Sequence, residues 1–239
     1  MNRINEINNL DLKGKPLIQS FSGSGAIGTI LSTFLVKALK MEQAAVVHAD
    51  ELPPVAIIKG GLIEQPIRIF QNDNIALMSC EVNIPYNTVS DFIGMLVDFY
   101  IKSGVSHIVP VGGLPVLQNQ FEEIECYGIA NRQETLTFLE EKGVQLLEEG
   151  IVYGTVVETL ELCNTKEFDS SFALLVECDP SVASYDSTKK LVQNLAKIFD
   201  FEFDEEEFEN ISNIIRTRIE ESTRFLREEA MDKTRESHL

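Results

Sequence analysis

Residues 16–28 read PLIQSFSGSGAIG and place a glycine-rich turn between a strand pattern and a helix pattern. The apolar run 16–21 predicts a buried strand, and apolar residues at helical spacing predict a helix over 26–40. Between them, Gly23-Ser24-Gly25-Ala26-Ile27-Gly28 fits the pattern G-x-G-x-x-G, the turn that lets a dinucleotide pyrophosphate approach a helix N-terminus. The segment therefore predicts a strand–turn–helix unit of an α/β protein.

The sequence after this unit argues against a dinucleotide site. Asp50 and Glu51 follow a second predicted strand, 44–49, and are candidates for the acidic residue that contacts a ribose. A dinucleotide-binding half then requires a second helical crossover, whereas here Pro53-Pro54 and hairpin-like strands follow. A sharp strand-to-helix turn packed under a neighbouring strand requires small residues by itself. We therefore expect packing, not a cofactor, to explain the glycines.

Strand and helix patterns alternate along the rest of the chain. Gly60-Gly61 predicts a hairpin turn between strands 55–59 and 66–70, and Gly112-Gly113 predicts the end of strand 105–111. Further strands are predicted at 75–80, 127–130, 144–147 and 172–178, and further helices at 88–102, 133–142, 155–164 and 187–199. We expect one α/β domain over 1–203.

The composition shifts beyond residue 203. The acidic run 204–207 suits the start of a long helix, whose apolar residues recur at helical spacing to about residue 231. The last residues are polar. We expect 204–239 to be a C-terminal helical appendage with a polar tail, in which Phe225 and Leu226 are candidate partner contacts.

Charge and cysteine content limit the function classes. The chain has 239 residues, 44% of them hydrophobic, and a formal net charge of −18. Such an acidic chain repels phosphate backbones and anionic lipids, so neither nucleic acid nor a membrane is an expected partner. The first fifteen residues lack an apolar core, so we expect no signal peptide and a cytoplasmic protein. The four scattered cysteines, Cys80, Cys126, Cys163 and Cys178, are expected to be buried, reduced thiols.

Catalytic and metal-binding patterns are incomplete. Thr29 follows Gly28 without the lysine of a phosphate-binding P-loop, and no H-E-x-x-H spacing occurs. His107 lies in a predicted buried strand and is expected to be a hydrogen-bonded core imidazole, while His48 has no accompanying nucleophile elbow. The carboxyl edge of the sheet could still hold a small molecule. The candidate residues for such a site are Gly23, Gly25, Gly28, Gly112, Gly113 and Asp179.

Several segments together carry a family resemblance. They are the turn at 23–28, HADELPPVAIIKGG (48–61), PIRIF (66–70), VPVGGLP (109–115), YGIA (127–130), GVQLLEEGIVYG (143–154) and LLVECDP (174–180). Their order and spacing resemble the archaeal and bacterial homologues of proteasome assembly chaperone 2, over about residues 16–225. The resemblance implies an α/β three-layer sandwich with a mixed central sheet, similar to the nucleoside-phosphorylase-like fold.

The resemblance also implies a function without catalytic residues or cofactors. It implies a homo-oligomer, with a trimer favoured over a tetramer or pentamer, and binding to proteasome α-subunits. Some archaeal relatives dock through a C-terminal hydrophobic-Tyr-any motif, but this chain ends Ser237-His238-Leu239 and departs from that pattern. His238 and Leu239 remain candidate contacts. The expected function is a non-catalytic, chaperone-like scaffold, and the alternative is a small-molecule or nucleotide-binding enzyme that uses the turn at 23–28.

Overall fold

The computed structural model describes the chain except for residues 1–2, 50–51, 53–54, 117–122 and 217–239. The chain divides into two compact units, Met1–Phe203 and Asp204–Leu239. The described part of the second unit is a helix over 205–216. The Asp204 carboxylate caps this helix, because its Oδ1 accepts the backbone N–H groups of Glu206 and Glu207 at 2.8 and 3.1 Å.

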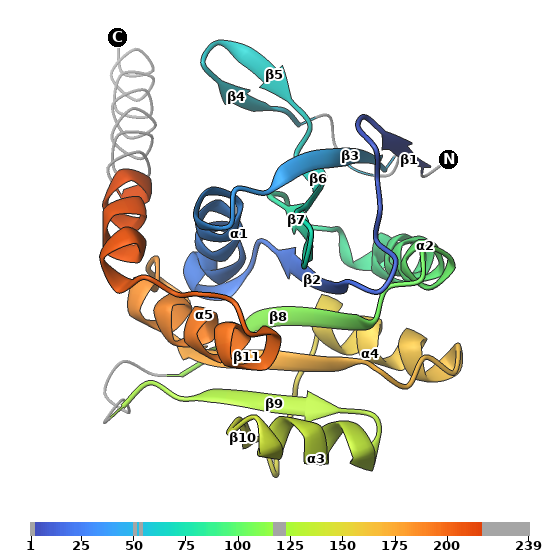
Figure 1. Cartoon of the computed structure of the whole chain (residues 1–239), viewed down its shortest axis with the longest axis vertical. Helices are drawn as coiled ribbons and strands as arrows, with labels where there is room; N and C mark the ends of the chain where they lie inside the picture. Colours follow the sequence, from blue (N-terminus) through green and yellow to red (C-terminus); the bar gives the residue numbers. More distant parts are fainter. Residues whose placement is uncertain (1–2, 50–51, 53–54, 117–122, 217–239) are drawn as a thin grey trace, which may run out of the picture. The chain divides into compact units, whose positions relative to one another are not determined.

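The first unit alternates strands and helices (Figure 1). Its strands are β1 (Arg3–Glu6), β2 (Pro16–Phe21), β3 (Glu42–His48), β4 (Ile57–Lys59), β5 (Leu62–Glu64), β6 (Ile67–Gln71), β7 (Ala76–Cys80), β8 (His107–Pro115), β9 (Cys126–Ala130), β10 (Gln145–Leu146) and β11 (Phe172–Cys178). Its helices are α1 (Ile27–Ala38), α2 (Val89–Lys102), α3 (Gln133–Glu141), α4 (Thr155–Thr165) and α5 (Tyr185–Phe199), with short 3-10 helices at Ser24–Ala26 and Tyr86–Thr88.

Nine strands form one mixed sheet in the order β1-β3-β6-β7-β2-β8-β11-β9-β10. The centre of the sheet is parallel: β2 pairs with β7 and with β8, and β8 pairs with β11. The strands from β1 to β7 on one side pair antiparallel, as β9 does with β11 on the other. The parallel strands end at a common edge, which is where α/β proteins bind ligands.

Helices cover both faces of this sheet. Contacts place α1 and α5 together on one face, and α2 and α4 together on the other (Figure 1). The apolar stripe of α2 is fully buried and contains Phe92, Ile93, Leu96, Val97 and Tyr100. Because both faces are covered, the central strands are buried on both sides: every residue from Leu17 to Phe21 is buried, including the polar Gln19 and Ser20. The prediction of a mixed sheet between helical layers is confirmed, while the named fold remains a prediction.

The Gly60-Gly61 hairpin pairs different strands from those predicted. The turn joins β4 to β5, and these two strands form a separate two-stranded ribbon. The segment predicted as the second arm belongs to β6, which lies in the large sheet between β3 and β7. The turn itself matches the prediction, since both glycines have positive φ, 56° and 80°.

The structure corrects one predicted strand end and adds one strand that was not predicted. Gly112-Gly113 does not end a strand, because β8 runs through both glycines to Pro115 and pairs with β11 at Leu175 and Val176. The predicted break assumed that paired glycines mark a turn, whereas here they sit in an extended strand. Strand β1, which pairs antiparallel with β3, was not predicted because its sequence RINE is short and polar.

Candidate functional site

A pocket of about 370 Å³ lies at the carboxyl ends of the parallel strands. The ends of β2 and β8 form its floor, and α1 and α4 both begin beside it, at Ile27 and Thr155. The loop after β7, with Asn83 and Ile84, contributes a further wall. The pocket therefore occupies the edge of the sheet at which the sequence placed a candidate site.

Four of the six candidate residues line this pocket. Gly23 and Gly28 come from the turn between β2 and α1, and Gly112 and Gly113 come from β8. The structure thus joins two glycine pairs that are far apart in the sequence. Asp179 does not line the pocket. Its Oδ1 accepts the backbone N–H and the hydroxyl of Ser181 at 2.8 and 2.6 Å, which makes it part of a local turn.

Close packing explains why two of the turn residues are glycine. A Cβ atom on Gly28 would overlap the carbonyl oxygen of Phe21, and the Gly28 carbonyl accepts a hydrogen bond from the Ser20 hydroxyl at 3.0 Å. Gly25 lies outside the pocket lining, with a φ of 65°, and a Cβ there would lie 2.9 Å from Ser184 Oγ. The Gly25 carbonyl also accepts the Ser184 N–H at 2.8 Å.

Gly113, on β8, packs closely against the same turn. A Cβ atom at Gly113 would lie 2.5 Å from Cys178 Sγ and 2.8 Å from the carbonyl oxygen of Ser24. Gly23, by contrast, has an extended backbone with a φ of −170° and open space around it. At Gly25, Gly28 and Gly113 the expectation that packing accounts for the glycines is therefore met by direct contacts.

The pocket is lined mainly by apolar and small side chains, with few reactive groups. Its residues are Phe21, Ser22, Gly23, Ser24, Ile27, Gly28, Asn83, Ile84, Val111, Gly112, Gly113, Leu114, Pro115, Ile151, Val152, Tyr153, Gly154, Thr155, Val156 and Leu175. This set contains no acid, lysine, arginine, histidine or cysteine. Ser22, Ser24, Tyr153 and Thr155 bring hydroxyl groups to the lining, but no carboxylate, histidine or lysine that could activate a hydroxyl as a nucleophile is among the lining residues.

Sequence reasoning missed the loop residues of this site. The segment 151–156, before and at the start of α4, supplies several lining residues, and Ile151 and Tyr153 remain 88% and 82% exposed at the rim. Asn83 and Ile84 were also not considered. The available signal was the uncharged run Ile151-Val152-Tyr153 directly before a helix, since a contiguous group of large apolar residues in a loop is typical of an interaction site.

His107 lies at the other end of β8, away from the pocket. Its ring stacks on Phe138 at 5.9 Å, and its Nδ1 lies 3.1 Å from Ser106 Oγ. Burial lowers the pKa of His107 below its ordinary value, so the ring is neutral at pH 7. A shallow depression beside it contains Arg132, whose Nε donates to Asp169 at 2.7 Å. His107 is half-buried at the edge of this depression and packs against Phe138, Phe172 and Phe199, so the prediction of a core imidazole is only partly right.

The four cysteines are buried and free, as the sequence predicts. Burial raises the pKa of Cys80, Cys126 and Cys163 to about 12 and that of Cys178 to about 11. They are therefore neutral thiols at pH 7, and the thiolate is the form that reacts or binds metal. Within the described part of the chain, no three histidine, cysteine or acidic side chains come together as a metal site would require.

Some candidates cannot be placed on this structure. Asp50 and Glu51, considered for a ribose contact, lie outside the described residues, as do Phe225, Leu226, His238 and Leu239. None of the helices in the described ranges is both long and apolar enough to cross a lipid bilayer.

Comparison with known proteins identifies relatives along almost the whole chain. The model of the PAC2 family matches residues 17–223. An uncharacterised protein of Methanocaldococcus jannaschii is 23% identical over 207 residues, which is 87% of this chain and 82% of that protein.

Solved structures of similar fold include two proteins of Pyrococcus furiosus. PbaA, described as an archaeal homologue of proteasome-assembly chaperone, superposes with a TM-score of 0.80 at 21% identity, covering 98% of this chain and 97% of PbaA. PbaB, described as an archaeal proteasome activator, superposes with a TM-score of 0.76 at 16% identity, covering 95% of this chain and 98% of PbaB. At these identities the superpositions establish a common fold.

Proposed function

We propose that this chain, which belongs to the PAC2 family, is a non-catalytic, chaperone-like scaffold that binds proteasome subunits or another protein partner. The family supports the class of function, because its structural relatives include a homologue of proteasome-assembly chaperone and a proteasome activator. We propose α-subunits of the proteasome as the first partner to test, in the cytoplasm.

The composition of the strand-end pocket is the main support for proposing that the protein is not an enzyme. The pocket at the strand ends is lined by apolar and small neutral residues, with no ionisable side chain other than the phenol of the exposed Tyr153. The glycines that suggested a cofactor are explained at Gly25, Gly28 and Gly113 by contacts within the protein. A site of this composition suits the burial of another protein's apolar surface better than bond cleavage.

We also propose that the scaffold is a homo-oligomer, with a trimer favoured over a tetramer or pentamer. A ring of identical subunits presents the same surface several times, which increases the effective affinity for a partner that is itself a ring. Exposed apolar side chains on the first unit, such as Tyr86 at 96% exposure, supply surface for such contacts.

The direct test uses purified components. The full chain would be mixed with purified α-subunits of the proteasome from the same organism and analysed by size exclusion with light scattering. We expect the chain alone to elute at a multiple of its own mass, and the mixture to give a stoichiometric complex. A chain that stays monomeric at micromolar concentration contradicts the oligomer, and separate elution of the two proteins contradicts the proposed partner.

Binding of a small molecule in this pocket is the second candidate function, because four of the six candidate residues line the pocket. A thermal-shift series with nucleotides and nicotinamide cofactors tests it. A saturable rise of several degrees that Thr155→Val abolishes would favour this alternative, since Thr155 lines the pocket at the start of α4. We expect no saturable shift. Gly25→Val is unsuitable for this test, because Gly25 packs against Ser184 and Cys178 outside the pocket.

A further inference from the structure

The ribbon formed by β4 and β5 exposes large apolar side chains. Ile58, Leu62 and Ile63 are 65%, 74% and 73% exposed, and Ile58 pairs directly with Ile63 across the two strands. In the described chain, no strand of the nine-stranded sheet pairs with this ribbon, which projects from the top of the first unit (Figure 1). A two-stranded ribbon is only marginally stable in water, so one that exposes isoleucine and leucine is expected to have a contact surface.

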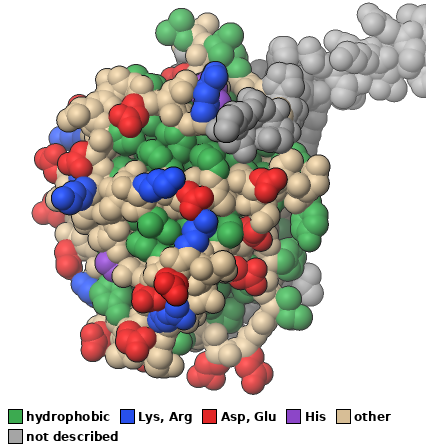
Figure 2. Space-filling model, turned by 90° about the vertical axis from the view of Figure 1, so that its right-hand side faces the viewer, with side chains coloured by type: hydrophobic (Ala, Val, Ile, Leu, Met, Phe, Trp, Pro, Cys, Tyr) green, Lys and Arg blue, Asp and Glu red, His purple; other side chains and the backbone are tan. Residues whose placement is uncertain are grey.

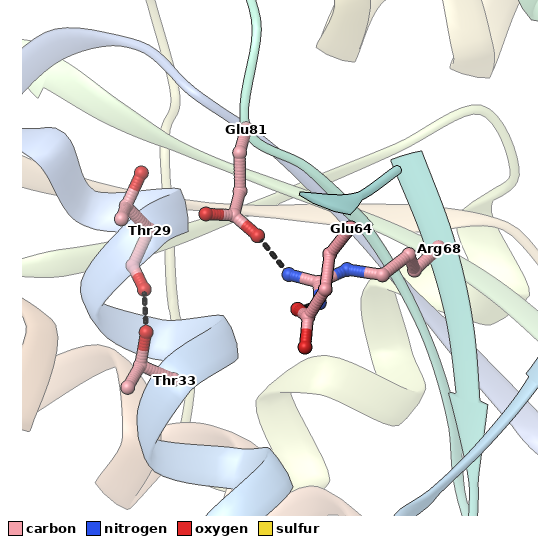
Figure 3. A network of polar contacts seen from close by, with 5 residues as sticks. All are labelled: Thr29, Thr33, Glu64, Arg68 and Glu81. Carbon is pink, nitrogen blue, oxygen red and sulfur yellow. Dashed lines mark hydrogen bonds and ion pairs between the residues drawn. The ribbon is translucent and has the colours of Figure 1, made fainter. Parts of the chain in front are cut away.

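The base of the ribbon is anchored to the body of the first unit by Arg68. The guanidinium of Arg68, on β6, contacts the carboxylates of Glu64 at the end of β5 and of Glu81 after β7 (Figure 3). It also lies over the Phe70 ring, 5.3 Å from the centroid, and the Arg68 side chain is only 10% exposed. Ordering a surface before it binds lowers the entropic cost of association. The ribbon is thus held at its base and closed by a tight turn at its tip.

The strand-end pocket is the complementary hollow surface of the same unit. Its volume of about 370 Å³ is bounded largely by aliphatic side chains, among them Ile84, Leu114 and Val156. The exposed side chains of Ile151 and Tyr153 extend this apolar surface at the rim. The ribbon is a projecting apolar surface and the pocket is a hollow, uncharged apolar surface. A ribbon of this kind could therefore bind in a pocket of this kind.

The charge of these two surfaces is compatible with a second copy of this chain as the occupant. With a net charge of −18, two copies repel one another, and burying an acidic side chain in their interface would add a desolvation cost. Acidic side chains are scattered over the face that Figure 2 shows, with hydrophobic side chains at its upper tip. The pocket lining contains no acidic residue, and the one acidic residue of β4 and β5, Glu64 at the base of the ribbon, is paired with Arg68.

We infer that the β4–β5 ribbon of one copy inserts into the strand-end pocket of the next copy. The inference rests on the homo-oligomer proposed above and names its contact surfaces. Because the ribbon and the pocket are different parts of one chain, each copy donates one ribbon and accepts another, so the contact is heterologous. Heterologous contacts that close give a cyclic ring, the symmetry that a trimer requires. Ile58 and Ile63, which pair across the ribbon and share one face, are the inserted side chains.

The test uses one variant of each surface. Ile58→Asp with Ile63→Asp changes the ribbon, and Ile151→Asp changes the rim of the pocket. All three positions are exposed, so the variants are expected to keep the far-UV circular dichroism and the cooperative unfolding of the wild type. By light scattering at a concentration where the wild type is oligomeric, each variant alone should be monomeric. Ile7→Asp, at a 53% exposed position after β1, is the matched control and should stay oligomeric.

Mixing the two variants distinguishes this contact from a symmetric one. The pocket variant still has an intact ribbon and the ribbon variant an intact pocket, so an equimolar mixture should give a one-to-one dimer that cannot close. A mixture that stays monomeric overturns the inference, as does a ribbon or pocket variant that keeps the wild-type mass. A monomeric wild type would contradict the proposed oligomer itself, so the two failures are distinguishable.

Discussion

Two glycine turns in this chain look alike in sequence and exist for different reasons. At Gly60-Gly61 both residues have positive φ and nothing lies within 4 Å of where a Cβ would be, so only their own backbone requires glycine. At Gly28 the φ is ordinary for a helix, and the requirement comes from the carbonyl of Phe21 in the preceding strand. Gly60 and Gly61 thus depend on local conformation and Gly28 on tertiary contact, so substitutions at these positions should have very different effects.

The largest effect is expected from Gly28→Ala. The new methyl group overlaps the Phe21 carbonyl, so the start of α1 must move away from the end of β2. We expect a loss of about 3 kcal/mol in the free energy of unfolding, measured by urea denaturation at fixed protein concentration. A loss under about 1 kcal/mol would show that the helix can shift, and would contradict the contact-based explanation of this glycine.

Gly113→Ala tests the packing of β8 against the turn between β2 and α1. Its methyl group would lie 2.5 Å from Cys178 Sγ and 2.8 Å from the Ser24 carbonyl, and we expect a loss of about 2 kcal/mol. The double variant with Cys178→Ala removes only the sulfur contact. We therefore expect Gly113→Ala to cost less in the Cys178→Ala background than in the wild type, and the coupling energy of the double-mutant cycle measures this difference. Strict additivity of the two substitutions would rule out the sulfur contact as a cause.

Gly61→Ala addresses the other turn. The added methyl group meets open space, but a φ of 80° is unfavourable for alanine, so we expect a cost of about 1 kcal/mol confined to the ribbon. Amide hydrogen exchange should show faster exchange in β4 and β5 and unchanged exchange in β2. Gly60→Asn is the matched control, because asparagine tolerates the left-handed conformation and should preserve the ribbon. A change in β2 exchange would argue against a purely local turn.

Gly94→Ala is the smallest change and has the opposite sign. Gly94 lies inside α2, has an ordinary φ, and has no neighbour within 4 Å of the Cβ position. Alanine should stabilise the protein by about 0.5–1 kcal/mol, since it reduces the entropy of the unfolded chain. Thermal unfolding measures the gain as a raised Tm. A destabilised variant would indicate a contact on this face of α2 that the spacing around Gly94 does not predict.

The elements that the sequence predicted well are those with a strong internal pattern. Strand β2 has the predicted bounds, and α1 and α2 lie within two residues of theirs, because a continuous apolar run and a helical stripe determine these elements locally. The pocket was predicted in part: the carboxyl edge followed from parallel strands, and Gly23, Gly28, Gly112 and Gly113 do line it. Gly25 and Asp179 were placed at this edge as well, but they serve packing and a local turn.

The remaining errors concern which segments meet. Gly60-Gly61 marks a turn in the sequence, but only the sheet determines that β6 pairs with β3 and β7 and leaves β5 as the partner of β4. The run through Gly112 and Gly113 was predicted to break because a glycine pair usually marks a turn. In the fold, Gly113 instead lets β8 pass close to Ser24 and Cys178. The sequence alone does not reveal that Gly113 lies so close to Ser24 and Cys178.

By itself, the sequence determined the class of this protein: an α/β chain with a strand–glycine turn–helix unit, buried thiols, a strongly acidic surface and no complete catalytic motif. These properties depend on composition and on short-range periodicity, which each segment carries independently of its neighbours. The tertiary structure decided what the glycines are for, which of them line a pocket, and that Ile58, Leu62 and Ile63 face solvent on an anchored ribbon. Those properties depend on atoms of segments far apart in the chain, and only the folded sheet brings them together.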